Sequence, residues 1–146
     1  MRLLDLNLLL YSANADSPRH QRAKRWLEGV IGGSDSVALA WVTLLGFMRI
    51  STSRKVFAKP LDPERALAII DGWLARPNVV QLYPGPEHWR ILKALLLDTG
   101  AAGNLTTDAH LAALAIEHGC ELCSTDADFA RFPRLNWKNP LGTDRR

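Results

Sequence analysis

No apolar run in this chain reaches the roughly 18 residues that a membrane-spanning helix requires. The most apolar N-terminal stretch, residues 3–11, is interrupted by Asp5 and Asn7, which does not fit the unbroken apolar centre of a secretory signal peptide. The 146 residues are enough for one domain with a substantial core. We therefore expect a cytoplasmic protein.

Cysteine is scarce, since Cys120 and Cys123 are the only two. Their C-x-x-C spacing raises the possibility of a redox or zinc site. The segment is predicted to be a strand, in which three residues span about 10 Å, whereas a disulfide needs Cα atoms within about 7 Å. A second cysteine pair that could complete a zinc site is also missing. We expect two small core cysteines instead.

Neither sign of charge is in large excess, because 18 basic and 15 acidic side chains leave a net charge of +3. Residues 1–59 hold nine basic and four acidic side chains, while residues 60–146 hold nine and eleven. A basic bias in one part of the chain is compatible with a polyanionic partner. The same bias is common in proteins that bind no nucleic acid, so charge alone decides little.

Short apolar runs alternate with helical patterns along the chain. Strands are predicted over residues 2–5, 37–40, 79–82, 121–124 and 135–137. Helices are predicted from Ser17-Pro18 to Gly32, over 41–53, from Asp62-Pro63 to just before Pro77, over 87–97, and over 106–118 with Thr106 or Thr107 as the cap. This alternation is typical of an α/β domain with a mainly parallel sheet. We expect one domain over residues 1–146, with a loose tail from 139 to 146.

Four aspartates fall at one predicted edge of this sheet. Asp5 ends the first strand, Asp126 and Asp128 follow the fourth, and Asp108 lies in the first turn of the last helix. In open α/β sheets, ligands bind outside the carboxyl ends of the strands. If the first and fourth strands are neighbours, the carboxylates converge. Such an oxygen-rich set suits Mg²⁺ or Mn²⁺ rather than zinc.

Each acid also has a purely structural explanation. An aspartate in a first helical turn, such as Asp108, commonly just stabilises the helix. Asp128 could cap the short turn that holds Phe129. Asp5 is harder to explain in this way, because a carboxylate at the end of an apolar strand is costly to bury without a partner. The combined position of the acids favours a metal site.

Four segments of the chain resemble a known family. They are M-R-L-L-D-L-N-L-L-L-Y (1–11), W-V-T-L-L-G-F-M-R-I-S-T (41–52), L-T-T-D-A-H-L-A-A-L-A (105–115) and S-T-D-A-D-F (124–129). Their order and spacing are similar to those of the PIN domain, and more closely to the VapC toxins of bacterial VapBC toxin–antitoxin systems, of the mycobacterial type. The resemblance implies a three-layer α/β/α fold with a central, mainly parallel sheet.

The resemblance also implies an activity and partners. It implies an endoribonuclease that depends on Mg²⁺, with Mn²⁺ as a substitute, is inhibited by a cognate VapB antitoxin and often forms a homodimer. By position, Asp5, Asp108 and Asp126 match the metal-binding acids of the first, third and fourth motifs, Asp128 is an additional catalytic acid, and Asn7 and Thr125 match supporting polar positions. Arg49 lies where a helix arginine is common in the family, and we assign it no catalytic role.

One position departs from the family pattern. Many PIN nucleases carry a glutamate in the second motif, where this chain has Gly46. No acidic residue between Asp35 and Asp62 replaces it. The complete four-acid ligand set therefore does not carry over, and the number of bound ions is left open. We hypothesise that Asp128 compensates.

The leading hypothesis is thus a metal-dependent ribonuclease in which Asp126 or Asp128 orients the attacking water. Basic side chains could contact RNA phosphates or simply form a solvated helix face; they are Arg19, Arg22, Lys24, Arg25, Arg54 and Lys55. An antitoxin tail is expected to lie across an apolar groove and to insert a basic residue among the acids.

Two other functions stay open. Gly46 motivates a catalytically weak PIN-like module that only binds RNA or its antitoxin. A phosphoryl-transfer or receiver-like domain with an aspartyl nucleophile is the other. A dehalogenase-type phosphatase would want a second aspartate where this chain has Asn7, and we find no strand-end lysine suited to a receiver domain.

Overall fold

The strands of this protein form a single parallel sheet. The computed structural model describes residues 1–100 and 103–142. The strand order is β3-β2-β1-β4-β5, and every neighbouring pair is parallel. The strands are β1 (Arg2–Leu4), β2 (Val37–Ala40), β3 (Val79–Leu82), β4 (Glu121–Cys123) and β5 (Trp137–Lys138). The predicted α/β class and parallel sheet are confirmed.

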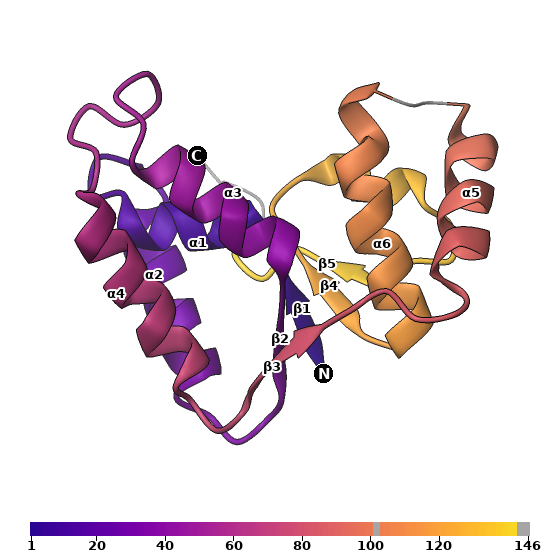
Figure 1. Cartoon of the computed structure of the whole chain (residues 1–146), viewed down its shortest axis with the longest axis horizontal. Coiled ribbons are helices and arrows are strands. Elements are labelled where there is room, and N and C mark those ends of the chain that lie inside the picture. Colours follow the sequence, from indigo (N-terminus) through magenta and orange to yellow (C-terminus); the bar gives the residue numbers. More distant parts are fainter. Residues whose placement is uncertain (101–102, 143–146) are drawn as a thin grey trace.

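Helices cover both faces of the sheet, so that the fold has three layers (Figure 1). One layer contains α1 (Leu6–Ala13), α2 (His20–Ile31), α3 (Trp41–Ser51) and α4 (Pro63–Leu74). The other contains α5 (His88–Thr99) and α6 (Thr106–His118), with the short 3₁₀ helices η1 (Gly103–Leu105) and η2 (Ala127–Arg131). None of the described helices combines the length and apolar character needed to cross a membrane.

The central strands supply side chains to two separate cores. Along β1, Leu3 packs against the α5–α6 layer and Leu4 against the α1–α4 layer. The same alternation holds for Leu122 and Cys123 of β4, as expected for a strand buried on both faces. Cys120 and Cys123 are buried free thiols, and burial raises the pKa of Cys123 to about 12. The expectation of core cysteines is therefore confirmed.

Helix α1 is an element that the strand and helix patterns did not predict. Asp5 caps it, since the Asp5 backbone is extended and its Oδ1 accepts a hydrogen bond from Leu6 N at 2.8 Å. The apolar run that begins at Leu3 therefore consists of a three-residue strand followed directly by a helix, and Asp5 is the junction between them.

Several helix ends differ from the predicted ones. Helix α2 begins at His20, because Ser17 and Pro18 form a turn in which Ser17 Oγ accepts from Arg19 N. Neither threonine caps α6, which instead continues from η1 with Leu105 at the cap position. In the predicted tail, residues 143–146 lie outside the described residues, whereas Asn139 and Leu141 belong to a hydrogen-bonded turn.

Candidate metal centre

The site lies at the carboxyl edge of the sheet, where β1 and β4 end side by side. Leu4 pairs with Cys123 in the parallel register, so that Asp5 and Ser124 are the next residues of the two strands. The backbone N–H of Asp5 donates to Cys123 O at 2.9 Å. This adjacency is the condition on which convergence of the aspartates depended.

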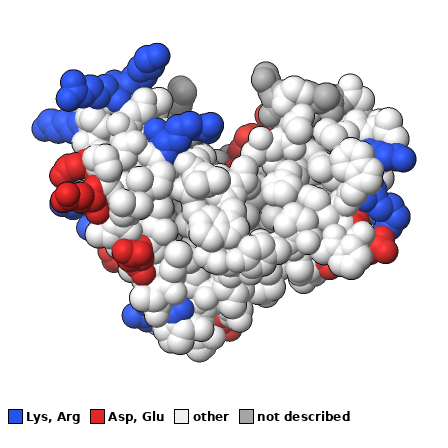
Figure 2. Space-filling model, in the orientation of Figure 1, with Lys and Arg blue, Asp and Glu red and all other residues white. Residues whose placement is uncertain are grey.

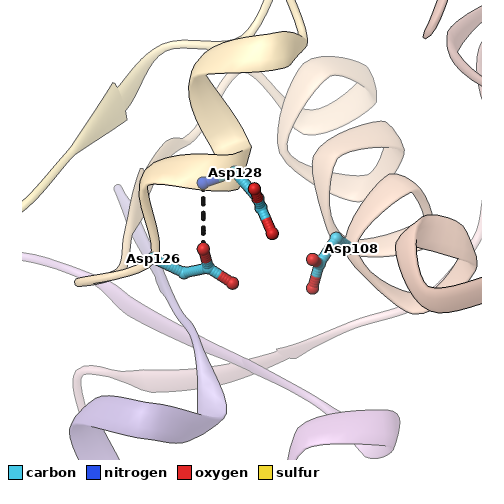
Figure 3. A group of neighbouring side chains, drawn as sticks. All are labelled: Asp108, Asp126 and Asp128. Atoms are coloured by element: carbon cyan, nitrogen blue, oxygen red, sulfur yellow. Dashed lines mark hydrogen bonds between the residues drawn. The ribbon is translucent and has the colours of Figure 1, made fainter.

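Three of the four predicted acids form a compact group. One carboxylate oxygen from each of Asp108, Asp126 and Asp128 lies within 4.8 Å of the others. Figure 3 shows Asp108, from α6, pointing across toward Asp126 and Asp128, which come from the start of η2. Asp126 Oδ1 accepts from Asp128 N at 2.9 Å, so that Asp126 caps η2 and the two carboxylates are fixed on one short loop.

Asp5 lies beside this group but is held differently. It is buried, Oδ1 accepts from Leu6 N, and Oδ2 accepts from Ser124 Oγ at 2.7 Å. Asp5 is close enough for its charge to act on Asp108. The structure thus brings all four predicted acids to one edge, with Asp5 anchored behind the other three.

Ser124 connects the supporting residues of the site and was not predicted as part of it. Its hydroxyl donates to Asp5 and accepts from Asn7 Nδ2 at 3.2 Å and from Asp126 N at 3.0 Å. The only sequence signal was a hydroxyl residue at the end of the predicted fourth strand. Thr125 is half-buried in the same loop, and none of the hydrogen bonds of the described residues involves its side chain.

Two acids of the site, Asp108 and Asp5, have raised pKa values. Burial, followed by the charges of Asp5, Asp126 and Asp128, raises the pKa of Asp108 from 3.8 to about 6. Burial also raises the pKa of Asp5, although its hydrogen bonds from Ser124 and Leu6 act in the opposite direction. A cation among these carboxylates would relieve both effects.

The donor set fits a hard divalent cation. All ligand atoms of the group are carboxylate oxygens, which Mg²⁺ and Mn²⁺ prefer over softer donors. Asn7 Oδ1 adds a buried oxygen that has no hydrogen-bond partner within the described part of the chain. Such an atom is expected to be paired with a ligand or with an ordered water.

Gly46 lies at the same edge, on α3, where its close neighbour is Leu6. A Cβ atom at Gly46 would lie 2.7 Å from Leu6 Cδ2. A second-motif acid at position 46 would therefore require the end of the Leu6 side chain to move.

The predicted RNA-contacting basic residues lie on α2 and on the loop after α3, where Lys24, Arg25, Arg54 and Lys55 are exposed. Arg19 is instead engaged by Tyr11, whose hydroxyl accepts from Arg19 Nη1 at 2.9 Å. Figure 2 shows basic side chains on the α3 side of a notch and acidic side chains within it. Contacts between these basic residues and RNA stay a prediction.

Comparison with known proteins agrees with this geometry. The PIN domain family profile matches residues 2–135. Ribonuclease VapC37 of Mycobacterium tuberculosis is 43% identical over 140 residues, covering 96% of this chain and 97% of that protein. Ribonuclease VapC33 of the same species is 44% identical over 141 residues, covering 97% and 99%.

Solved structures show the same fold. The crystal structure of VapBC2 from Rickettsia felis bound to a promoter DNA fragment contains a chain that superposes with a TM-score of 0.67 at 20% identity, covering 94% of this chain and 97% of that one. Together with the sequence matches, this shows that the chain belongs to the PIN-domain family, within its VapC group.

Proposed function

We propose that this protein is a divalent-metal-dependent endoribonuclease and the toxin half of a toxin–antitoxin pair. The observation that carries the proposal is the group formed by Asp108, Asp126 and Asp128 beside the buried Asp5. RNA as the substrate is supported by the names of the two mycobacterial relatives, which are called ribonucleases. Because a ribonuclease toxin acts on cellular RNA, we also propose a cytoplasmic location.

Asp5, Asp108 and Asp126 are the proposed ligands of the ion. When bound, Mg²⁺ or Mn²⁺ supplies positive charge that stabilises a phosphodiester under attack and makes a water molecule more acidic. Ser124 and the N–H of Leu6 hold the Asp5 carboxylate in a fixed orientation. Each Asp5 oxygen retains a second lone pair for a ligand.

Asp128 is suited to a different task. Its side chain is 49% exposed, so it stands at the solvent side of the group. From there its carboxylate can orient a water molecule and accept its proton. It can also add a fourth oxygen donor in place of the acid that Gly46 lacks.

The proposed antitoxin would use two surfaces. A recess of about 260 Å³ between α2 and α4 has an apolar lining that includes Leu27, Ile69 and Trp73, and an antitoxin tail could cover it. A basic side chain of the tail, placed among the acids, would replace the cation electrostatically. A homodimer is also proposed, through the uncharged centre of the face that Figure 2 presents, which lies between charged side chains at its two sides.

The proposal is tested with purified protein, total cellular RNA and Mg²⁺, Mn²⁺ or EDTA. Asp108→Asn and Asp126→Asn are expected to lower the cleavage rate by about 100-fold or more. Asp71→Asn, an exposed aspartate on α4, is the matched control and should cleave like the wild type.

The competing binding-module hypothesis predicts another result. It rests on Gly46, which supplies no second-motif acid and against which the Leu6 side chain packs. If stoichiometric wild-type protein leaves RNA intact in every metal while calorimetry detects no bound Mn²⁺, the nuclease proposal fails and the module is favoured.

A further inference from the structure

We propose that a recess between α1, α3 and α6 holds an unstacked base of the RNA substrate, next to the phosphate that is cut. This inference rests on the proposed function and specifies where the substrate lies. The recess has a volume of about 330 Å³, within the range of about 300–1,000 Å³ that is usual for small-molecule sites. Its lining residues are Leu6, Val42, Leu45, Gly46, Arg49 and Thr107.

Two lining residues of the recess are sequence neighbours of acids in the candidate metal centre. Leu6 directly follows Asp5, and Thr107 directly precedes Asp108. Two walls of the recess, on α1 and α6, are therefore each one residue away in sequence from an acid of the site. A nucleotide whose phosphate lies at the acids would have its base within reach of this space.

The chemistry of the walls suits a base with its phosphate. Val42, Leu45 and Gly46 present an apolar stripe of α3, and Arg49 continues that stripe one turn further. Within the described part of the chain, Arg49 has no ion pair, so its guanidinium is free to stack on a base or to pair with a phosphate. Sequence-specific RNA binding commonly uses unstacked bases against apolar, aromatic or arginine surfaces.

Gly46 is one of the residues that keep this space open. Because a Cβ atom at position 46 would lie 2.7 Å from Leu6 Cδ2, a side chain there would displace the end of the Leu6 side chain or enter the recess. Gly46, which departs from the common second motif, thus contributes space for the substrate instead of a metal ligand.

The first test uses a filling substitution and a matched control. Leu45→Trp fills the recess from an exposed position on α3, since Leu45 is 63% exposed. Leu67→Trp makes the same change at an exposed position on α4, where Leu67 is 52% exposed and outside the recess. The substrate is an RNA oligonucleotide that spans a cleavage site mapped in total RNA, with and without the base at each nucleotide flanking the cut.

For the wild type and Leu67→Trp, removing one flanking base should lower kcat/KM by about tenfold or more. Leu45→Trp should cleave the intact oligonucleotide at that reduced rate. Removing the base should lower its rate no further, because the substitution and the missing base remove the same interaction. An equal penalty for the missing base in Leu45→Trp and the wild type would overturn the inference while leaving the nuclease intact.

The second test does not require cleavage. In EDTA, the four nucleoside 5′-monophosphates are titrated into isotope-labelled protein, and backbone amide shifts are followed by NMR. Shifts at Val42, Gly46 and Thr107 that are present in Leu67→Trp and absent in Leu45→Trp support the recess even if no RNA is cut, which would then count against the proposed function alone.

Unperturbed amides with all four nucleotides would overturn the inference. So would a Leu45→Trp protein that cleaves normally but escapes inhibition by the antitoxin, since that result assigns the recess to the protein partner.

Discussion

Asp108 is the carboxyl group that the site perturbs most clearly, and its protonation should be visible in the stability of the metal-free protein. Its pKa is raised to about 6 in the folded chain and lies near 3.9 when unfolded, so the folded state binds more protons between these values. Stability should therefore fall as the pH rises from about 4 to about 6.

Asp108→Asn removes this dependence. In EDTA, we expect the variant to be more stable than the wild type at pH 7 by roughly 1 kcal/mol, a value reduced for solvent screening. The free energies of unfolding of the two proteins should converge near pH 4, where Asp108 is protonated. Urea unfolding at several pH values measures the free energy of unfolding of each protein, with Asp71→Asn as the control. A wild-type curve that Asp108→Asn leaves unchanged would contradict the electrostatic description of the site.

Ser124 is expected to matter for stability as well as for activity. Ser124→Ala leaves the buried Asp5 Oδ2 without its hydroxyl partner and removes an acceptor from Asn7 and Asp126. The loss should be about 1–3 kcal/mol in urea unfolding, because one buried acceptor and two donors lose their hydrogen-bond partner. Ser53→Ala, which removes only an exposed turn hydrogen bond to Lys55 N, should cost far less. Equal costs would mean that Ser124 does not organise the site.

Asp128 tests the compensation for Gly46. Its oxygen lies within 4.8 Å of ligand atoms on Asp108 and Asp126, so Asp128→Asn should weaken Mn²⁺ binding about tenfold and slow cleavage. Calorimetry and the RNA assay report the two effects separately. If both stay at wild-type values, the compensation hypothesis is wrong.

At the scale of elements, α6 carries opposite electrostatic effects at its two ends. Near its C-terminus, Glu117 accepts hydrogen bonds from Gly85 N at 2.8 Å and Glu87 N at 2.9 Å, which tie α6 to the segment before α5. The N–H of Gly85 is the main cause of the lowered pKa of Glu117. A lowered pKa means stability that is present at neutral pH and lost as the pH falls through the folded pKa.

Glu117→Gln should therefore destabilise the protein at pH 7 and change little at acid pH, the reverse of the Asp108→Asn behaviour. Thermal unfolding at pH 7 and near pH 3 distinguishes the two ends of the helix. The neighbouring Glu87, which is exposed, provides Glu87→Gln as the control. A destabilisation that is independent of pH would show that packing, not charge, dominates at Glu117.

The elements also show what the sequence could and could not predict. The strands and most helices followed from apolar runs and caps, and the four aspartates from their place at strand and helix ends. Helix α1 was missed because leucine predominates on both sides of Asp5 between Leu3 and Tyr11, which hides the change of period after Asp5. The roles of Ser124 and Leu6 depend on strand pairing and on the α1–α3 contact, which no local pattern contains.

At the scale of the whole molecule, the exposed apolar side chains predict self-association. Trp41 is 47% exposed at the start of α3, and its Nε1 donates to the hydroxyl of Tyr83, which is also exposed. Large exposed aromatic side chains on an uncharged face are characteristic of protein interfaces. The proposed homodimer would bury this face.

Trp41→Glu is designed to disrupt that dimer without unfolding the chain, because a glutamate in the first turn of a helix is favourable. We expect the dimer dissociation constant to rise by about tenfold or more, measured by sedimentation over a concentration series. Leu67→Glu, on the exposed side of α4, should leave it unchanged. A wild type that is monomeric at all concentrations would contradict the homodimer, whereas dissociation by Leu67→Glu but not by Trp41→Glu would move the interface to the α4 side.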